Sequence, residues 1–209
     1  MTGFIDLWAA FFIQMFIIID PIAGVPVFLA ITPHSSSDKR RLMARRGCLA
    51  AFGVLAFFLL IGPPFVSFFG ITPPAVRICG GVLLFFIGIE MLYGRRTGTE
   101  TTPGEERLAE AKDDISITPL AIPLLAGPGA ITTTLIFAGR AQTPADHLAL
   151  FLSLAGVFAL TFVFLRQADR LMNLIGLLGA TILTRIMGLV LAFLAVQYVI
   201  DGITAAWRQ

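Results

Sequence analysis

The sequence predicts an all-α integral membrane protein whose six transmembrane helices form two inverted three-helix repeats. Three observations lead to this fold class. The 209 residues are 57% hydrophobic and only 13% charged, with a mean hydropathy of +0.89, whereas about a quarter of the residues of a soluble domain are charged. Six apolar windows follow one another along the chain, and its two halves resemble each other.

Each apolar window has about 20 residues or more, enough to cross roughly 30 Å of hydrocarbon. The first carries Asp6 and Asp20 and has no basic flank before it, which argues against a cleaved signal peptide. The weakly amphipathic segment Asp169–Thr184 is expected at the inner interface, or entering the membrane part-way before the last window. The windows are Phe4–Ala30, Ala44–Phe69, Pro74–Tyr93, Thr118–Gly139, His147–Leu165 and Thr181–Ala205.

An internal repeat relates the third and sixth windows. Arg77–Phe85 aligns without gaps with Arg185–Phe193, and the same offset places Gly94 on Gly202. An offset one residue shorter places Pro21 on Pro128. We therefore expect a single domain over residues 1–209, made of repeat A (1–94), a cytoplasmic linker (95–117) and repeat B (118–209). Because three is an odd number, the second repeat enters the membrane from the opposite side.

Basic residues predict the orientation of the chain. If both termini face outward, all but three of the 15 basic residues fall in inner loops, as the positive-inside rule requires. The three exceptions are Arg77, Arg140 and Arg208. The net charge of +2 thus reflects topology, and no basic patch with interleaved aromatic residues indicates nucleic-acid binding.

Helix-breaking residues interrupt the first and fourth windows. Asp20-Pro21 is typical of an N-cap followed by Pro at the first helical position. In the second half, Gly127-Pro128-Gly129 takes the same place without a capping side chain. Interrupted spanning helices are tolerated only where the freed backbone groups face protein or a polar cavity, and a matched pair indicates a midplane substrate site.

The two breaks differ in charge, and the difference predicts a ligand. Asp20 offers a carboxylate, whereas an uncapped helix start offers amides and a positive dipole end that suit an anion. Together they are expected to hold the ammonium and carboxylate groups of one small zwitterion. Hydroxyls of Thr132, Thr133 and Thr134 either line this pocket or bond to the preceding turn of their own helix. The predicted substrate-binding residues are Asp20, Pro21, Gly24, Gly127, Pro128, Gly129, Ala130, Ile131 and Thr132.

Other polar residues in the windows suggest further roles. Asp20 is costly to ionise at the midplane and is either a proton carrier or a plain cap; Glu90 is the second candidate proton carrier, or the partner of Arg95 at the cytoplasmic edge. Gln14 and Gln197 are candidates for lining the pathway. Neither the two cysteines nor the two histidines have metal-ligand spacing, so we expect no metal and no cofactor.

At these residues the sequence resembles the MarC family of six-span bacterial and archaeal membrane proteins, some of which are described as small neutral amino acid transporters. The resemblance covers nearly the whole chain and rests on Asp20-Pro21 with Pro26, on Pro119–Thr132 and on Met187–Ile203. It implies a multi-pass inner-membrane carrier for glycine- or alanine-sized substrates, with proton coupling as a further expectation. Many members carry Gly-Asn where this chain has Ala23-Gly24.

A secondary transporter of small neutral amino acids, working by alternating access, is therefore the favoured function. The alternative is a channel or an efflux protein for another small solute, although a wide conduction path needs more polar lining than these windows provide. An enzyme is disfavoured because no HExxH, no GxSxG and no paired His occurs. The expected partners are the substrate and the lipid bilayer, and a homo-oligomer is compatible with the sequence.

Overall fold

The computed structural model describes residues 2–33, 35–94, 120–121 and 125–208, in which helices are joined by turns and no strand occurs. The predicted linker 95–117 lies outside the described residues. The helices are α1 (Thr2–Ile19), α2 (Pro21–Ala30), α3 (Ser37–Phe68), α4 (Pro73–Tyr93), α6 (Pro128–Ala138), α7 (Pro144–Arg166) and α8 (Ala168–Trp207).

The all-helical membrane fold is confirmed for this part of the chain. Five segments of the described residues are long and apolar enough to cross a bilayer, and α1 with α2 counts as one of them. In the predicted fourth window, Thr118–Gly139, the helix α6 is shorter than the predicted span. It begins only after the Gly127 break and is a shorter apolar helix of 11 residues.

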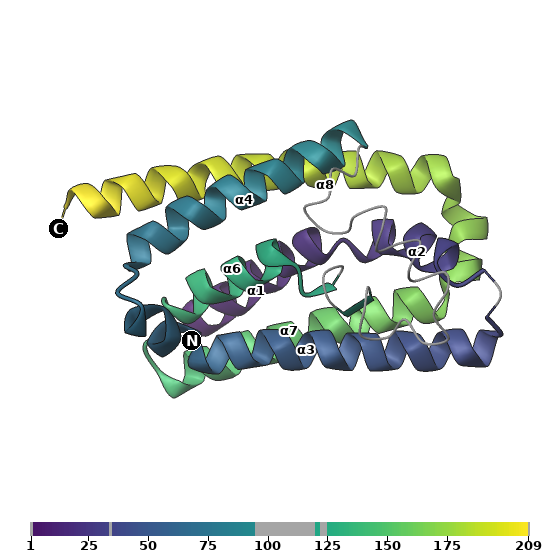
Figure 1. Cartoon of the computed structure of the whole chain (residues 1–209), viewed down its shortest axis with the longest axis horizontal. Coiled ribbons are helices and arrows are strands. Elements are labelled where there is room, and N and C mark those ends of the chain that lie inside the picture. The colour runs from purple at the N-terminus through teal and green to yellow at the C-terminus, as the bar shows by residue number, and fades with distance from the viewer. Residues whose placement is uncertain (1, 34, 95–119, 122–124, 209) are drawn as a thin grey trace.

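The helices form three layers (Figure 1). In one outer layer α4 pairs with α8, and in the other α3 pairs with α7. The middle layer holds α1, α2 and α6, and it contacts both outer layers because α1 packs on α7, α2 on α8, and α6 on both α3 and α4. The two interrupted segments are thus enclosed between two pairs of long helices. The start of α1 and the end of α8 lie at the same end of the molecule (Figure 1).

Small residues allow α4 and α8 to approach closely. A Cβ atom placed on Gly88 would lie 2.9 Å from the carbonyl oxygen of Gly188, so the two backbones are nearly in contact. In a membrane, where hydrophobic association between helices is weak, such close packing is a main source of helix pairing. The facing positions, spaced seven residues apart on each helix, are Pro74 with Gly202, Gly81 with Ala195 and Gly88 with Gly188.

Two helices extend well beyond the predicted apolar windows. The 32-residue helix α3 starts at Ser37, where the Ser36 hydroxyl accepts a hydrogen bond from the Lys39 amide at 3.3 Å. The 40-residue helix α8 starts at Ala168 and bends at Gly176, whose φ of 69° lies in the left-handed region. Asp169–Thr184 is therefore the bent first part of α8. At this end, Arg40 of α3 binds Asp169 of α8 through both carboxylate oxygens, at 2.9 and 3.1 Å.

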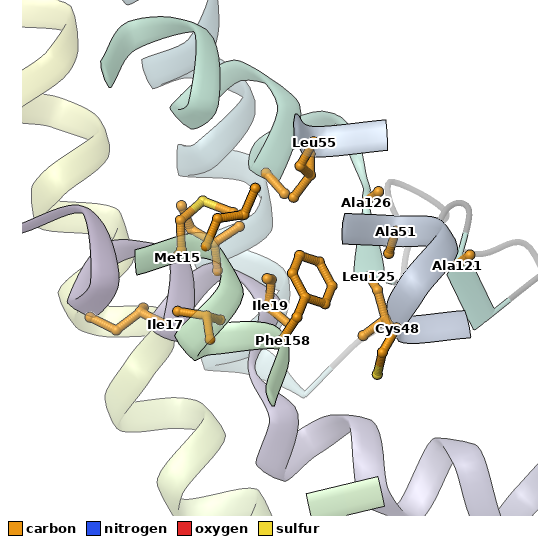
Figure 2. Packing of buried hydrophobic residues seen from close by; sticks show 14 of the residues in the cluster. Met15, Ile17, Ile19, Cys48, Ala51, Leu55, Ala121, Leu125, Ala126 and Phe158 are labelled. Atoms are coloured by element: carbon orange, nitrogen blue, oxygen red, sulfur yellow. The ribbon is translucent and has the colours of Figure 1, made fainter. Parts of the chain in front are cut away.

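Buried side chains fill the space between α1, α3, α7 and the residues that precede α6. Figure 2 shows part of this cluster. Met15 of α1 and Leu55 of α3 are fully buried. Leu125 and Ala126, which come directly before the second break, belong to the same cluster and are 2% exposed each. The chain is thus held in place by apolar packing up to the residue at which α6 begins.

Candidate functional site

The first break has the predicted cap geometry at Asp20. Its backbone, with φ 39° and ψ 69°, is left-handed, and among the described residues it is the one non-glycine position with a positive φ. The side-chain Oδ1 accepts a hydrogen bond from the Ala23 amide at 3.2 Å, and Pro21 occupies the first turn of α2. Asp is among the residues that best tolerate this conformation. The chain can therefore end α1 and restart as α2 within one residue.

The second carboxylate oxygen of Asp20 makes no comparable contact. Asp20 is 7% exposed, and its Oδ2 atom is buried without a hydrogen-bond partner among the described residues. The Thr184 side chain of α8 lies beside the carboxyl group. A buried polar atom left unpaired is uncommon in native structures and calls for an explanation such as a bound water, a proton or a ligand.

A cavity of about 340 Å³ adjoins this carboxyl group, a volume at the lower end of the range of about 300–1,000 Å³ that is usual for small-molecule sites. It lies between α2, the last turns of α4 and the part of α8 that follows the Gly176 bend. Its polar side chains are Asp20, Glu90, Thr181 and Thr184. The other lining residues are Ile19, Ala23, Gly24, Pro26, Val27, Ala30, Ile87, Met91, Gly94, Leu177 and Ala180.

Gly24 is a predicted site residue with open space beside its backbone. It lines the cavity, and a Cβ placed on it would meet no atom within 4 Å. Pro21, by contrast, is buried at the start of α2 and is not part of the cavity wall.

The second break also has the predicted form, since Gly127 is the N-cap of α6 with no side-chain cap and Pro128 follows it. The amide of Ile131 is not one of the free amides expected at this helix start, because it donates to the Gly127 carbonyl at 3.0 Å as the first bond of the helix. The Thr132 hydroxyl donates a hydrogen bond to the Pro128 carbonyl at 2.8 Å. Of the two predicted alternatives for this hydroxyl, the structure therefore has the bond to the preceding turn of its own helix.

The two breaks lie close together but do not share one open space. A Cβ placed on Gly129 would lie 2.7 Å from Cδ1 of Ile87 and 3.5 Å from Cγ2 of Ile18. Ile87 also lines the Asp20 cavity. One side chain of α4 thus lies between the backbone of α6 and the cavity. Residues 127–132, Ala130 included, are not part of the cavity wall.

The remaining predicted residues fall in different places. Glu90 lines the cavity and has an interaction partner, while its predicted partner Arg95 lies outside the described residues. Gln14 accepts a hydrogen bond from the Tyr198 hydroxyl of α8 and so links two layers. Gln197 is exposed and donates to the Asp201 carboxylate at 2.7 Å, away from the cavity.

The sequence prediction missed the contribution of α8 to the cavity. Thr181 and Thr184 are three residues apart on the same face of an apolar helix, and this spacing was the available signal. It was overlooked because the segment was expected either at the inner interface or only part-way in the membrane, whereas α8 runs along the bundle after the bend at Gly176.

An aromatic layer lies toward the end of the molecule that holds both termini. The rings of Phe11 in α1 and Phe137 in α6 are 5.0 Å apart, and both side chains are buried. The Arg140 guanidinium lies 5.1 Å from the Phe137 ring centroid and 5.8 Å from that of Tyr198. This packing closes the middle of the bundle on the side of the breaks opposite to the cavity.

Among the described residues no cluster of His, Cys, Asp or Glu has the arrangement of a metal site. In that part of the chain Cys48 is buried and Cys79 is exposed, and both are free thiols.

Comparison with known proteins agrees with this architecture. The family model of "MarC family integral membrane protein" matches residues 5–207. A UPF0056 membrane protein of Aquifex aeolicus is 34% identical over 97% of this chain and 95% of its own length, and one of Methanocaldococcus jannaschii is 36% identical over 93% and 95%. The UPF0056 inner membrane protein YhgN of Escherichia coli is 33% identical over 91% of this chain and 93% of its own length. No solved structure matches. With a family match over nearly all of its length and an all-helical bundle interrupted at Asp20 and Gly127, the chain belongs to the MarC family of integral membrane proteins.

Proposed function

We propose that this chain is a secondary transporter of small neutral amino acids of glycine or alanine size, and not an enzyme. One observation carries the proposal. A buried carboxyl group with an unpaired oxygen adjoins a cavity at an interrupted helix inside a membrane protein. Ionisable groups in such places are expensive to bury and mark substrate or ion pathways.

The charge of the two breaks supports a zwitterionic substrate. In the proposed binding mode the substrate ammonium group approaches Oδ2 of Asp20 from the cavity, and Thr184 lies beside it. The substrate carboxylate is drawn to the start of α6, where Gly127 leaves the helix without a side-chain cap. Because Ile87 lies between Gly129 and the cavity, a rotation of this side chain or a small shift of α4 is needed to join the two halves.

An inverted repeat provides the proposed motion. Under the repeat, α2 corresponds to α6 and α8 corresponds to α4, and the contacts fit because α2 packs on α8 and α6 packs on α4. Movement of one three-helix unit against the other would exchange the open and closed ends, which is the general plan of transporters with inverted repeats. In our proposal the termini face outward and the cavity faces the cytoplasm of a bacterial or archaeal cell.

Proton coupling is proposed at Asp20, with Glu90 as the second candidate. Both side chains line the same cavity. A proton that binds Asp20 would remove the uncompensated charge left when the substrate ammonium group departs. The empty carrier would then change back to its first conformation with a neutral Asp20 and without an unpaired buried charge.

The first experiment is uptake of labelled glycine and alanine into proteoliposomes, with and without an imposed pH gradient, against empty liposomes. Saturable uptake that the gradient drives uphill is expected. Uptake that only dissipates a solute gradient and does not saturate would instead indicate a channel. Protein-containing liposomes that match empty ones would contradict the proposed substrate.

The Asp20→Asn variant tests the role of the carboxylate. Asn tolerates left-handed backbone and caps helices about as well as Asp, so the variant should fold with unchanged thermal stability in detergent. We expect it to lose gradient-driven accumulation. Asp201→Asn is the matched control, since Asp201 is also within a span but lies outside the cavity and binds Gln197. Normal transport by Asp20→Asn at every pH would exclude Asp20 as the proton carrier.

A further inference from the structure

Three consecutive threonines follow the second break, and their hydroxyl groups have different partners. The Thr132 hydroxyl donates to the Pro128 carbonyl at 2.8 Å, and the Thr134 hydroxyl donates to the Ala130 carbonyl at 2.8 Å. Thr133 makes no such bond. Its side chain is fully buried, and Oγ1 has no hydrogen-bond partner among the described residues.

The position of Thr133 on α6 places it between the cavity level and the aromatic layer. It lies one turn after Gly129, which packs against Ile18 and Ile87, and one turn before Phe137, whose ring contacts Phe11. Residues four apart share one face of a helix. The face of α6 that carries Thr133 therefore points into the packed interior of the bundle. This interior lies between the Asp20 cavity and the end of the molecule that holds the termini.

Two buried side-chain oxygens lack partners among the described residues, Asp20 Oδ2 and Thr133 Oγ1. Each belongs to an interrupted segment, and each lies within six residues of its break. An unpaired buried hydroxyl destabilises the state in which it is buried, while valine has nearly the same shape and leaves no polar atom unpaired. A threonine in this place therefore points to a partner that is present in another state of the protein.

We propose that Thr133 is a substrate-binding residue, whose hydroxyl donates a hydrogen bond to the substrate carboxylate when the substrate lies between the two breaks. This inference rests on the proposed transport function. The carboxylate is the assigned acceptor because Asp20 already matches the ammonium group. In the present conformation the interior is closed around Thr133, so the contact forms when α1 and α6 separate.

The test compares Thr133→Val with Thr134→Val, two isosteric changes at adjacent and equally buried positions. Thr133→Ser, which keeps the hydroxyl, is the conservative variant. Thermal unfolding in detergent and the KM for glycine uptake into proteoliposomes are measured for all three variants and for the unsubstituted protein. Substitution of a purely structural residue would change the thermal unfolding temperature and leave the KM for glycine uptake unchanged.

Thr133→Val is expected to be at least as stable as the unsubstituted protein and to raise KM by about tenfold, the effect of one lost hydrogen bond to a charged group. Thr134→Val is expected to keep its KM, and Thr133→Ser to retain most of the affinity. A Thr133→Val variant whose KM stays within about twofold of the unsubstituted value would overturn the assignment of Thr133 alone. Absence of uptake by the unsubstituted protein would overturn the proposed function together with this inference.

Discussion

At the scale of single residues, Asp20 combines a backbone role with a chemical one. Its left-handed conformation ends α1, its Oδ1 caps α2, and its Oδ2, beside the cavity, has no partner in the described part of the chain. A cap alone uses only one of the two oxygens. The second oxygen is what distinguishes this break from an ordinary helix start.

Gly24 provides a direct test of whether the cavity holds the substrate. Gly24→Ala introduces a methyl group into open space on the cavity wall, so the fold should persist, with stability unchanged or raised by about 0.4–1 kcal/mol. Because one methyl group is a large part of a small site, uptake affinity should fall by about tenfold. KM in proteoliposomes and the melting temperature in detergent are the measurements.

The control for this substitution is Gly53→Ala, which also adds a methyl group in open space but on the exposed surface of α3. It should change neither uptake nor, by more than a small increment, stability. Equal KM values for the two variants would show that the substrate does not occupy the cavity beside Gly24.

The sequence was sufficient for those parts of the site that depend on neighbouring residues. The cap at Asp20-Pro21 and the uncapped start at Gly127-Pro128 follow from local rules of helix ends, and the structure has both. The hydrogen-bond partner of each threonine hydroxyl and the hydrogen bond between Gln14 and Tyr198 could not be predicted from the sequence. The bond between Gln14 and Tyr198 depends on how α1 and α8 are rotated toward each other, and a bond from a threonine hydroxyl to its own helix depends on the side-chain rotamer. A single sequence encodes neither in a local pattern.

At the scale of helices, α4 and α8 are held together by backbone proximity. Their contact follows a seven-residue spacing of small residues, and Gly88 faces Gly188 near the end that holds the cavity. A Cβ atom added at Gly81, Gly88, Gly188 or Gly202 would lie within 3.0 Å of atoms of the facing helix, so it must push the two backbones apart. Because α4 belongs to repeat A and α8 to repeat B, this close contact is a place where the two units of the proposed motion meet.

Gly88→Ala tests this packing. The added Cβ would lie 2.9 Å from the Gly188 carbonyl oxygen and from the Ala192 amide nitrogen, both backbone atoms that cannot rotate away. We expect a destabilisation of about 1–3 kcal/mol, typical of overpacking, seen as a lower melting temperature in detergent. Gly53→Ala again serves as the control, and a Gly88→Ala protein that melts at the same temperature would argue against close packing of α4 on α8.

Helix boundaries show what hydropathy alone misses. The predicted windows begin at Ala44, because charged residues precede it, and at Thr181, because the segment before it is weakly amphipathic, whereas α3 begins at Ser37 and α8 at Ala168. A helix ends where its backbone is capped or turned, not where its side chains cease to be apolar. The serine cap at Ser36 sets the start of α3, whereas α8 starts at Ala168 and continues through the bend at Gly176.

At the scale of the whole molecule, the three layers place both ends of the described chain at one end of the bundle (Figure 1). Among the described residues, most of the basic ones belong to the opposite end, which also holds the cavity and the Arg40–Asp169 ion pair. Applied to these residues, the positive-inside rule predicts that the cavity end faces the cytoplasm. The all-helical, multi-span plan was predicted from the sequence, whereas six spans in two inverted repeats stay a prediction, since α6 is a shorter apolar helix within the described residues.

Cysteine labelling in intact cells checks the orientation. In a background with Cys48→Ala and Cys79→Ala, single cysteines replace Ser37 at the start of α3 and Gln142 between α6 and α7, both exposed. A membrane-impermeant maleimide should label Gln142→Cys in intact spheroplasts and Ser37→Cys only after permeabilisation. The reverse pattern would invert the orientation, and labelling of both from outside would contradict the layered topology.

The left-handed backbone at Asp20 has a consequence for how this protein can change over generations. Besides Asp, the residues that adopt this conformation most readily are Gly and Asn, and in the genetic code each is one nucleotide away from Asp. Loss of the charge therefore requires a single base change and no rearrangement of the fold. In a randomly mutagenised population selected only for a stable, membrane-inserted protein, Asn and Gly should appear at position 20, while selection for transport should return Asp.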